Sequence, residues 1–109
     1  MRRDFPSKFE PKIVSESTTL TTHDLTVKGL IVAGASGITI ALPTPQAALD
    51  GVECIVVNNS DGQVTLSCTN GFPNDADSLT LDASASLILY CAEVSAASYR
   101  WSSVGAKAA

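Results

Sequence analysis

The sequence is poor in charged and aromatic side chains, and each shortage removes a class of function. Charged residues make up 17% of the 109 residues and aromatic residues 6%, whereas an average domain is about one-quarter charged. Seven residues are basic and eleven acidic, so the net charge is −4. Phosphate binding needs clustered Lys and Arg, so nucleic acid is not an expected partner. The length fits one domain with a single modest core.

Long apolar runs, a secretory signal and paired cysteines are also missing. No run approaches the roughly 18 residues that a membrane span needs, and no apolar stretch with a cleavage site follows Arg2-Arg3. An odd number of cysteines excludes a complete disulfide framework, and each cysteine lies in an apolar alternation. We therefore expect no membrane partner, buried reduced thiols and synthesis in a cytosol. The cysteines are Cys54, Cys68 and Cys91.

Residues that could perform chemistry are few and scattered. The single histidine, His23, lies in an expected turn, and no G-x-S-x-G or comparable nucleophile motif occurs. The acidic stretch lacks the glycine and terminal glutamate of an EF-hand loop, so a solvated loop is favoured over calcium binding. We expect no catalytic residue, no metal and no cofactor, while an enzyme that depends on Asp75, Asp77 or Glu93 stays an alternative. The acidic stretch comprises Asn74, Asp75, Asp77 and Asp82.

Short strands separated by turn signals account for most of the chain. Asp61-Gly62 predicts a hairpin between two of them. After 37–42, the prolines Pro43 and Pro45 and a helical turn that ends at Gly51 predict a crossover from one sheet to another. About eight short strands predict an all-β domain, an antiparallel β-sandwich of jelly-roll type. The predicted strands are 18–22, 25–32, 37–42, 52–58, 63–68, 78–82, 86–92 and 99–104.

The first sixteen residues differ from the rest. They hold four basic and three acidic residues and two of the three phenylalanines, whereas residues 17–109 hold three basic and eight acidic residues. Two prolines and the absence of an apolar period predict an extended arm before a β-sandwich domain at 17–109. Aromatic side chains in a weakly basic arm suit docking onto a neighbouring surface. The expected contact residues are Arg2, Arg3, Phe5, Lys8, Phe9 and Lys12.

Two aromatic residues near the end of the chain allow two interpretations. Tyr99 and Trp101 are two residues apart on a predicted strand, so both side chains point to one face. They either close the core or pack across a subunit boundary.

The chain carries, in this order, the segments ITIALP, DGVECIVVNN, DGQVTLSC, DSLTLDASASLILYCA and YRWSSVG. Their order resembles a small β-domain of tailed-bacteriophage virion proteins, found in capsid decoration (cement) proteins, tail fibres and spikes. The resemblance covers roughly residues 30–105. The stretch AEVSAASYRW is longer than the usual turn before the tryptophan, so an elaborated loop is expected there.

The resemblance implies a non-enzymatic virion protein. The length and the N-terminal arm favour a decoration protein that is assembled in the host bacterial cytoplasm and binds the outer surface of a phage head. Its partners would be the major capsid protein and further copies of itself, as a homodimer or homotrimer. The alternative is an oligomeric tail-fibre or spike module that binds a host surface glycan or receptor.

Overall fold

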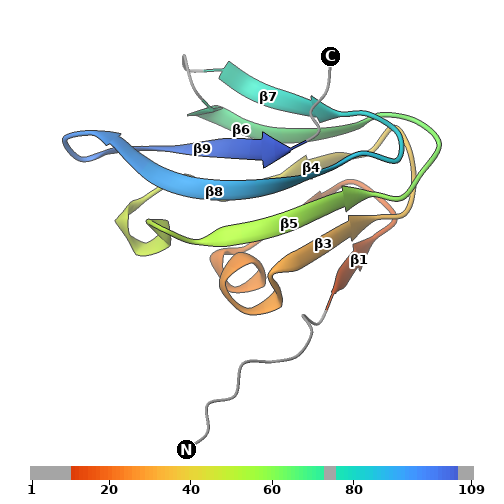
Figure 1. Cartoon of the computed structure of the whole chain (residues 1–109), viewed down its shortest axis with the longest axis horizontal. Helices are drawn as coiled ribbons and strands as arrows, with labels where there is room; N and C mark the ends of the chain where they lie inside the picture. The colour runs from red at the N-terminus through yellow and green to blue at the C-terminus, as the bar shows by residue number, and fades with distance from the viewer. Residues whose placement is uncertain (1–10, 73–75, 106–109) are drawn as a thin grey trace, which may run out of the picture.

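The computed structural model describes residues 11–72 and 76–105. Nine strands in these residues form two facing sheets (Figure 1). The five-stranded sheet has the order β1-β3-β5-β8-β9 and the four-stranded sheet the order β2-β4-β6-β7. The strands are β1 (Lys12–Val14), β2 (Thr18–Thr19), β3 (Leu30–Ala33), β4 (Thr39–Ala41), β5 (Glu53–Asn58), β6 (Val64–Phe72), β7 (Ala76–Leu81), β8 (Ser86–Ser95) and β9 (Ser98–Gly105).

The chain alternates between the two sheets from β1 to β6, so that it winds as three successive coils. β1, β3 and β5 pair in parallel in one sheet, and β2, β4 and β6 pair in parallel in the other. The antiparallel pairs β6–β7 and β8–β9 complete the two sheets, and β8 also pairs with β5. The coils are unequal: Lys12 pairs with Ile31, 19 residues on, and Leu30 with Ile55, 25 residues on. This inequality explains why the sequence shows no repeat.

The all-β class is confirmed, whereas purely antiparallel pairing is wrong and the jelly-roll arrangement is not confirmed. The sheets are mixed because the first six strands alternate between them. The hairpin predicted at Asp61-Gly62 is also wrong, since β5 and β6 lie in different sheets. The crossover predicted after β4 is confirmed: a 3-10 turn, η2 (Ala47–Leu49), and Gly51 at φ 84° lead from β4 to β5 in the other sheet.

Asn58 explains why the chain changes sheets at Asp61-Gly62 instead of forming a hairpin. Its side chain is fully buried at the end of β5. Its Oδ1 accepts hydrogen bonds from the backbone N–H (3.1 Å) and hydroxyl (2.6 Å) of Ser60. Its Nδ2 lies 2.8–3.0 Å from three carbonyl oxygens, which share its two N–H groups, and this network fastens the turn to the end of β7. The carbonyl groups belong to Gly62, Leu81 and Asp82.

The predicted strand 25–32 is a helical turn followed by a short strand. A π-helical turn, η1 (Asp24–Lys28), ends at Gly29, whose φ of 71° lies in the left-handed region that glycine adopts readily. The Asp24 carboxylate accepts a hydrogen bond from the N–H of Thr21, and the Thr21 hydroxyl oxygen accepts one from the N–H of Asp24. These reciprocal bonds fix the start of the turn and leave β3 only Leu30–Ala33.

The arm predicted at 1–16 ends earlier than expected. Residues Lys12–Val14 form β1 at the edge of the five-stranded sheet, and Val14 is 4% exposed in the core. β2 follows at Thr18–Thr19, so the β-sandwich begins with β1.

The core lies between the sheets and is filled mainly by alternate residues of the strands other than β2. Leu42 and Leu49, on either side of the crossover, belong to it as well. Trp101 is its largest fully buried side chain, and its indole N–H donates to the carbonyl oxygen of Pro43 at 2.9 Å. Other fully buried members are Leu20, Leu25, Ile31, Ile40, Val56, Val64, Leu66, Leu81 and Leu89.

Candidate interaction surface

The outer face of the five-stranded sheet is apolar, although it points away from the core. Along β5, Cys54 and Val56 are buried in the sandwich, while Ile55 and Val57 point outward and are half-buried. Outward positions of a two-layer sandwich are usually polar, because they face water.

These outward residues form two rows that run across the strands, because neighbouring strands pair in register. We call the two rows together the apolar face. The first row is Leu30, Ile55, Ile88 and Val104. The second row is Ile13, Val32 and Val57, and it ends at Ser86.

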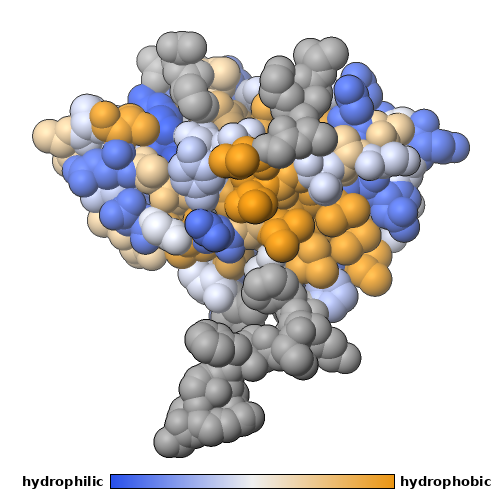
Figure 2. All heavy atoms as spheres, in the orientation of Figure 1, coloured by the Kyte–Doolittle hydropathy of each residue, from blue (hydrophilic) through white to orange (hydrophobic). Residues whose placement is uncertain are grey.

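Much of the apolar face is accessible to solvent in the single chain. Ile13 is 68% exposed, Val104 57% and Ile88 41%, and the other members are half-buried. In Figure 2 apolar side chains gather over β3, β5 and the adjoining part of β8. Isolated exposed apolar residues are ordinary, but a contiguous patch marks an interaction surface.

Polar side chains border the apolar face at one end. Glu53 on β5 pairs with Tyr90 on β8, which in turn pairs with Ser102 on β9. The two apolar rows themselves contain no ionisable side chain. The surface is therefore uncharged in its interior and polar at this rim, as the contact area of a protein–protein interface is.

The outer face of the four-stranded sheet has the opposite character. Its rows consist of threonine, serine and alanine, although its inward residues are as apolar as those of the other sheet. The first row is Thr39, Thr65 and Thr80. The second row is Thr19, Ala41, Ser67 and Ser78.

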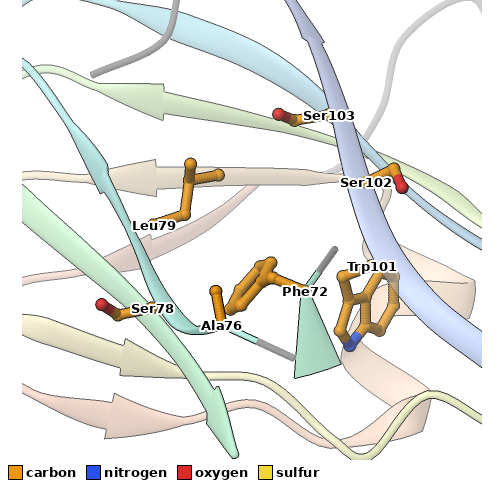
Figure 3. A pocket seen from close by; sticks show the side chains of 7 residues that line it. All are labelled: Phe72, Ala76, Ser78, Leu79, Trp101, Ser102 and Ser103. Atoms are coloured by element: carbon orange, nitrogen blue, oxygen red, sulfur yellow. The ribbon is translucent and has the colours of Figure 1, made fainter. Parts of the chain in front are cut away.

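A pocket of about 420 Å³ lies between β7 and β9, the last strands of the two sheets. Figure 3 shows Phe72 and Trp101 close together at one side of it, with Leu79 and the serines of β9 around the rest. Phe72 is 4% exposed and Trp101 0%, so neither ring offers a flat surface for a ligand to stack on.

The two aromatic residues on β9 both pack against the core, but they differ in burial. Trp101 closes the core, and its full burial leaves it no surface for a subunit boundary. Tyr99 is half-buried and packs against the edge of the core, and burial raises the pKa of its phenol. The loop expected in this part of the chain is instead a longer hairpin, because β8 continues to Ser95 and β9 begins at Ser98.

Of the residues assigned to the arm, Lys12 is the one that the structure describes. It lies on β1, and its Nζ is 3.8 Å from Oδ1 of Asp24. The hydrogen bond from the Thr21 N–H, more than this ion pair, holds the pKa of Asp24 below its usual value. Arg2, Arg3, Phe5, Lys8 and Phe9 lie outside the described residues.

The titratable residues weighed as chemistry lie on separate elements. His23 is exposed beside η1, as expected. Asp77 accepts a hydrogen bond from the N–H of Asn70, and Asp82 accepts one from the side chain of Gln63. Glu93 accepts one from the N–H of Ala97 in the β8–β9 turn. Asn74 and Asp75 lie outside the described residues, and among residues 11–72 and 76–105 no group of three or more potential metal ligands gathers.

The three cysteines are free thiols, as expected, but Cys68 is half-buried, whereas Cys54 and Cys91 are buried as predicted. Burial raises the pKa of Cys54 to about 11 and also raises the pKa of Cys68 and Cys91. A raised pKa keeps a thiol protonated at neutral pH and therefore a poor nucleophile.

Comparison with family models, with curated proteins and with solved structures finds no match. No helix in the described part of the chain is long and apolar enough to cross a membrane.

Proposed function

We propose that this protein is a non-enzymatic structural protein of a tailed-phage virion, a decoration protein that binds the outer surface of the head. The resemblance of its ordered strand segments to virion β-domains supports the assignment to a phage particle. The apolar face supports an assembly role, because a small domain in water gains nothing from seven outward aliphatic side chains unless another surface covers them. This face is the observation that carries the assembly role in the proposal.

The arm and the sheet edges supply the contacts with the shell. The arm precedes β1, and β1 is an edge strand of the five-stranded sheet, so the arm leaves the domain beside Ile13 in the apolar face. Phe5 and Phe9 anchor the arm in apolar sites on the major capsid protein, and Arg2, Arg3 and Lys8 pair with its carboxylates. Many such sites on one shell retain the protein through effective concentration.

Co-sedimentation with purified heads of the phage that encodes the protein tests this function. The full chain is expected to sediment with the heads to saturation and to raise the temperature at which they release DNA. Protein that stays in the supernatant at saturating concentration would refute the proposal.

Deletion variants separate the arm from the domain. Removal of residues 1–10 spares β1 and the buried Val14, so the domain should stay folded and lose binding to the heads. Removal of residues 106–109 from the other end is the control and should leave binding unchanged. Equal binding by both variants would exclude the arm as the anchor.

The glycan-binding alternative finds less support. Sugar recognition by stacking needs an exposed aromatic face, and Trp101 is buried. Binding of the protein to surface polysaccharide of the host, with no binding to heads, would favour this alternative.

A further inference from the structure

We infer that a second copy of this chain covers the apolar face, so that two five-stranded sheets pack against each other in a twofold-symmetric dimer. This inference deepens the proposed function, because it names the partner of the surface on which that proposal rests. In this dimer the arm and the sheet edges remain available for contacts with the shell.

The apolar face is large enough to form the centre of a dimer interface. Five strands at a spacing of about 4.8 Å make a sheet about 24 Å wide, and the two rows occupy about 14 Å along the strands. The projected area of the apolar face is therefore roughly 300 Å², and side-chain relief makes its accessible area larger. A standard interface buries about 800 Å² on each partner, so the two rows would form its apolar centre and the polar residues around them its rim.

The shape of the face also fits a copy of itself. Its side chains stand in two rows on adjacent outward positions of the same strands, so the rows are about 7 Å apart. The row that contains Ile55 and Ile88 on one copy can lie in the furrow between the rows of the other. Sheets that pack face to face in this way make cores about 10 Å thick, and residues of Ile, Leu and Val size fill them.

The charge distribution allows identical copies to meet through this face. Each copy carries a net charge of −4, so a contact between identical copies must avoid opposed carboxylates. Both apolar rows lack ionisable groups, and Glu53 lies outside them at the rim. A twofold axis brings the same patch of both copies together, and here that patch meets no like charge.

The matched pair Ile88→Glu and Thr39→Glu tests the inference. Both residues are exposed and lie on inner strands, Ile88 on β8 in the apolar face and Thr39 on β4 in the opposite face. Each change adds one negative charge to an outward position, so effects on net charge and strand propensity are shared. Sedimentation equilibrium of the full chain should give twice the monomer mass of 11.3 kDa. Ile88→Glu should weaken dimerisation at least ~100-fold, and Thr39→Glu should leave it unchanged.

Several results would overturn the inference. These are a wild-type monomer at every concentration, a trimer, a dimer that Ile88→Glu does not weaken, and equal weakening by both variants. Loss of the dimer on removal of residues 1–10 would assign self-association to the arm instead. If circular dichroism shows that Ile88→Glu is unfolded, Val104→Thr, at a 57% exposed position, takes its place.

Failure of this inference is distinguishable from failure of the proposed function. A monomer that sediments with phage heads would refute the dimer and leave the decoration role standing. A dimer that does not bind heads would refute the decoration role and leave the dimer standing.

Discussion

The two outer faces of this sandwich differ far more than the two inner faces do. β5 and β6 are interior strands of their sheets, and their inward residues Val56 and Leu66 are equally buried. Outward, β5 carries Ile55 and Val57, whereas β6 carries Thr65 and Ser67 at the equivalent positions. The four-stranded sheet shows that this fold tolerates a polar outer face. The proposed dimer accounts for the apolar outer face of the other sheet, which the folding of a two-layer sandwich does not require.

The largest effect is expected at Asn58, whose side chain on β5 joins the five-stranded sheet to the end of β7 in the other sheet. Asn58→Leu keeps the side-chain size but removes every hydrogen bond that joins β5 to the turn and to the end of β7. Several buried polar groups would lose their partner, so the free energy of unfolding should fall by about 3 kcal/mol or more. Urea denaturation of wild type and variant measures this difference.

The neighbouring asparagine provides the control. Asn59 is exposed, so Asn59→Ala should change the free energy of unfolding by no more than about 0.5 kcal/mol. Similar losses for both variants would show that the buried network does not hold the sheets together.

The second effect concerns the inward side of β5, where the thiol of Cys54 is buried. Cys54 lies between the outward residues Glu53 and Ile55, is 1% exposed, and has a pKa raised by burial to about 11 from 9.0. At pH 8 its thiolate is about 100-fold scarcer than in an exposed cysteine, so a thiol reagent should modify it at least that much more slowly. Fast modification in the native state would mean that the inner face is open.

The same shift predicts a pH dependence of stability. A folded-state pKa above the unfolded value means that the protonated thiol favours the folded state. The contribution of Cys54 is therefore complete below the unfolded value near 9.0 and is lost as the pH rises towards 11. Cys54→Ser should remove this part of the alkaline decline in thermal denaturation curves.

The smallest effect comes from exchanging a methyl group for a hydroxyl group on each face. Val104→Thr should weaken dimerisation about tenfold, because the hydroxyl must leave water without a partner. Thr39→Val on the opposite face should leave dimerisation unchanged. Both exposed changes should alter the free energy of unfolding by less than about 0.5 kcal/mol, measured by urea denaturation. Equal effects of the two substitutions on dimerisation would remove the distinction between the faces.

The sequence carries more information about individual strands than about their pairing. The alternation around Ile40 and the Pro43 stop place β4 and the crossover correctly, since local residues decide both. Parallel pairing joins residues 19 to 26 positions apart, such as Lys12 with Ile31 and Thr39 with Thr65, and coils of unequal length leave no repeat to reveal it. The burial of Asn58 depends on carbonyl groups of Leu81 and Asp82, which no local pattern indicates.

The apolar face did have a signal in the sequence. Its strands are continuous apolar runs, LIVA at 30–33 and CIVV at 54–57, whereas the four-stranded sheet has alternating segments such as VTLS at 64–67. A continuous run is typical of a strand covered on both faces. The sequence alone does not separate this meaning from a fully buried strand, and the solvent exposure of Ile88 and Val104 in the single chain makes the distinction.

Isotope-filtered NMR on the full chain can show which outer face meets a second copy. In a mixture of methyl-labelled and unlabelled protein, intermolecular contacts to the methyl groups of Ile55 and Ile88 report what covers the apolar face. We expect contacts between these methyl groups and the aliphatic residues of a second copy, with none to the methyl groups of Thr39 and Thr65. Intermolecular contacts confined to the outer face of the four-stranded sheet would contradict the proposed dimer. So would the absence of intermolecular contacts to Ile55 and Ile88 at concentrations where the protein is dimeric.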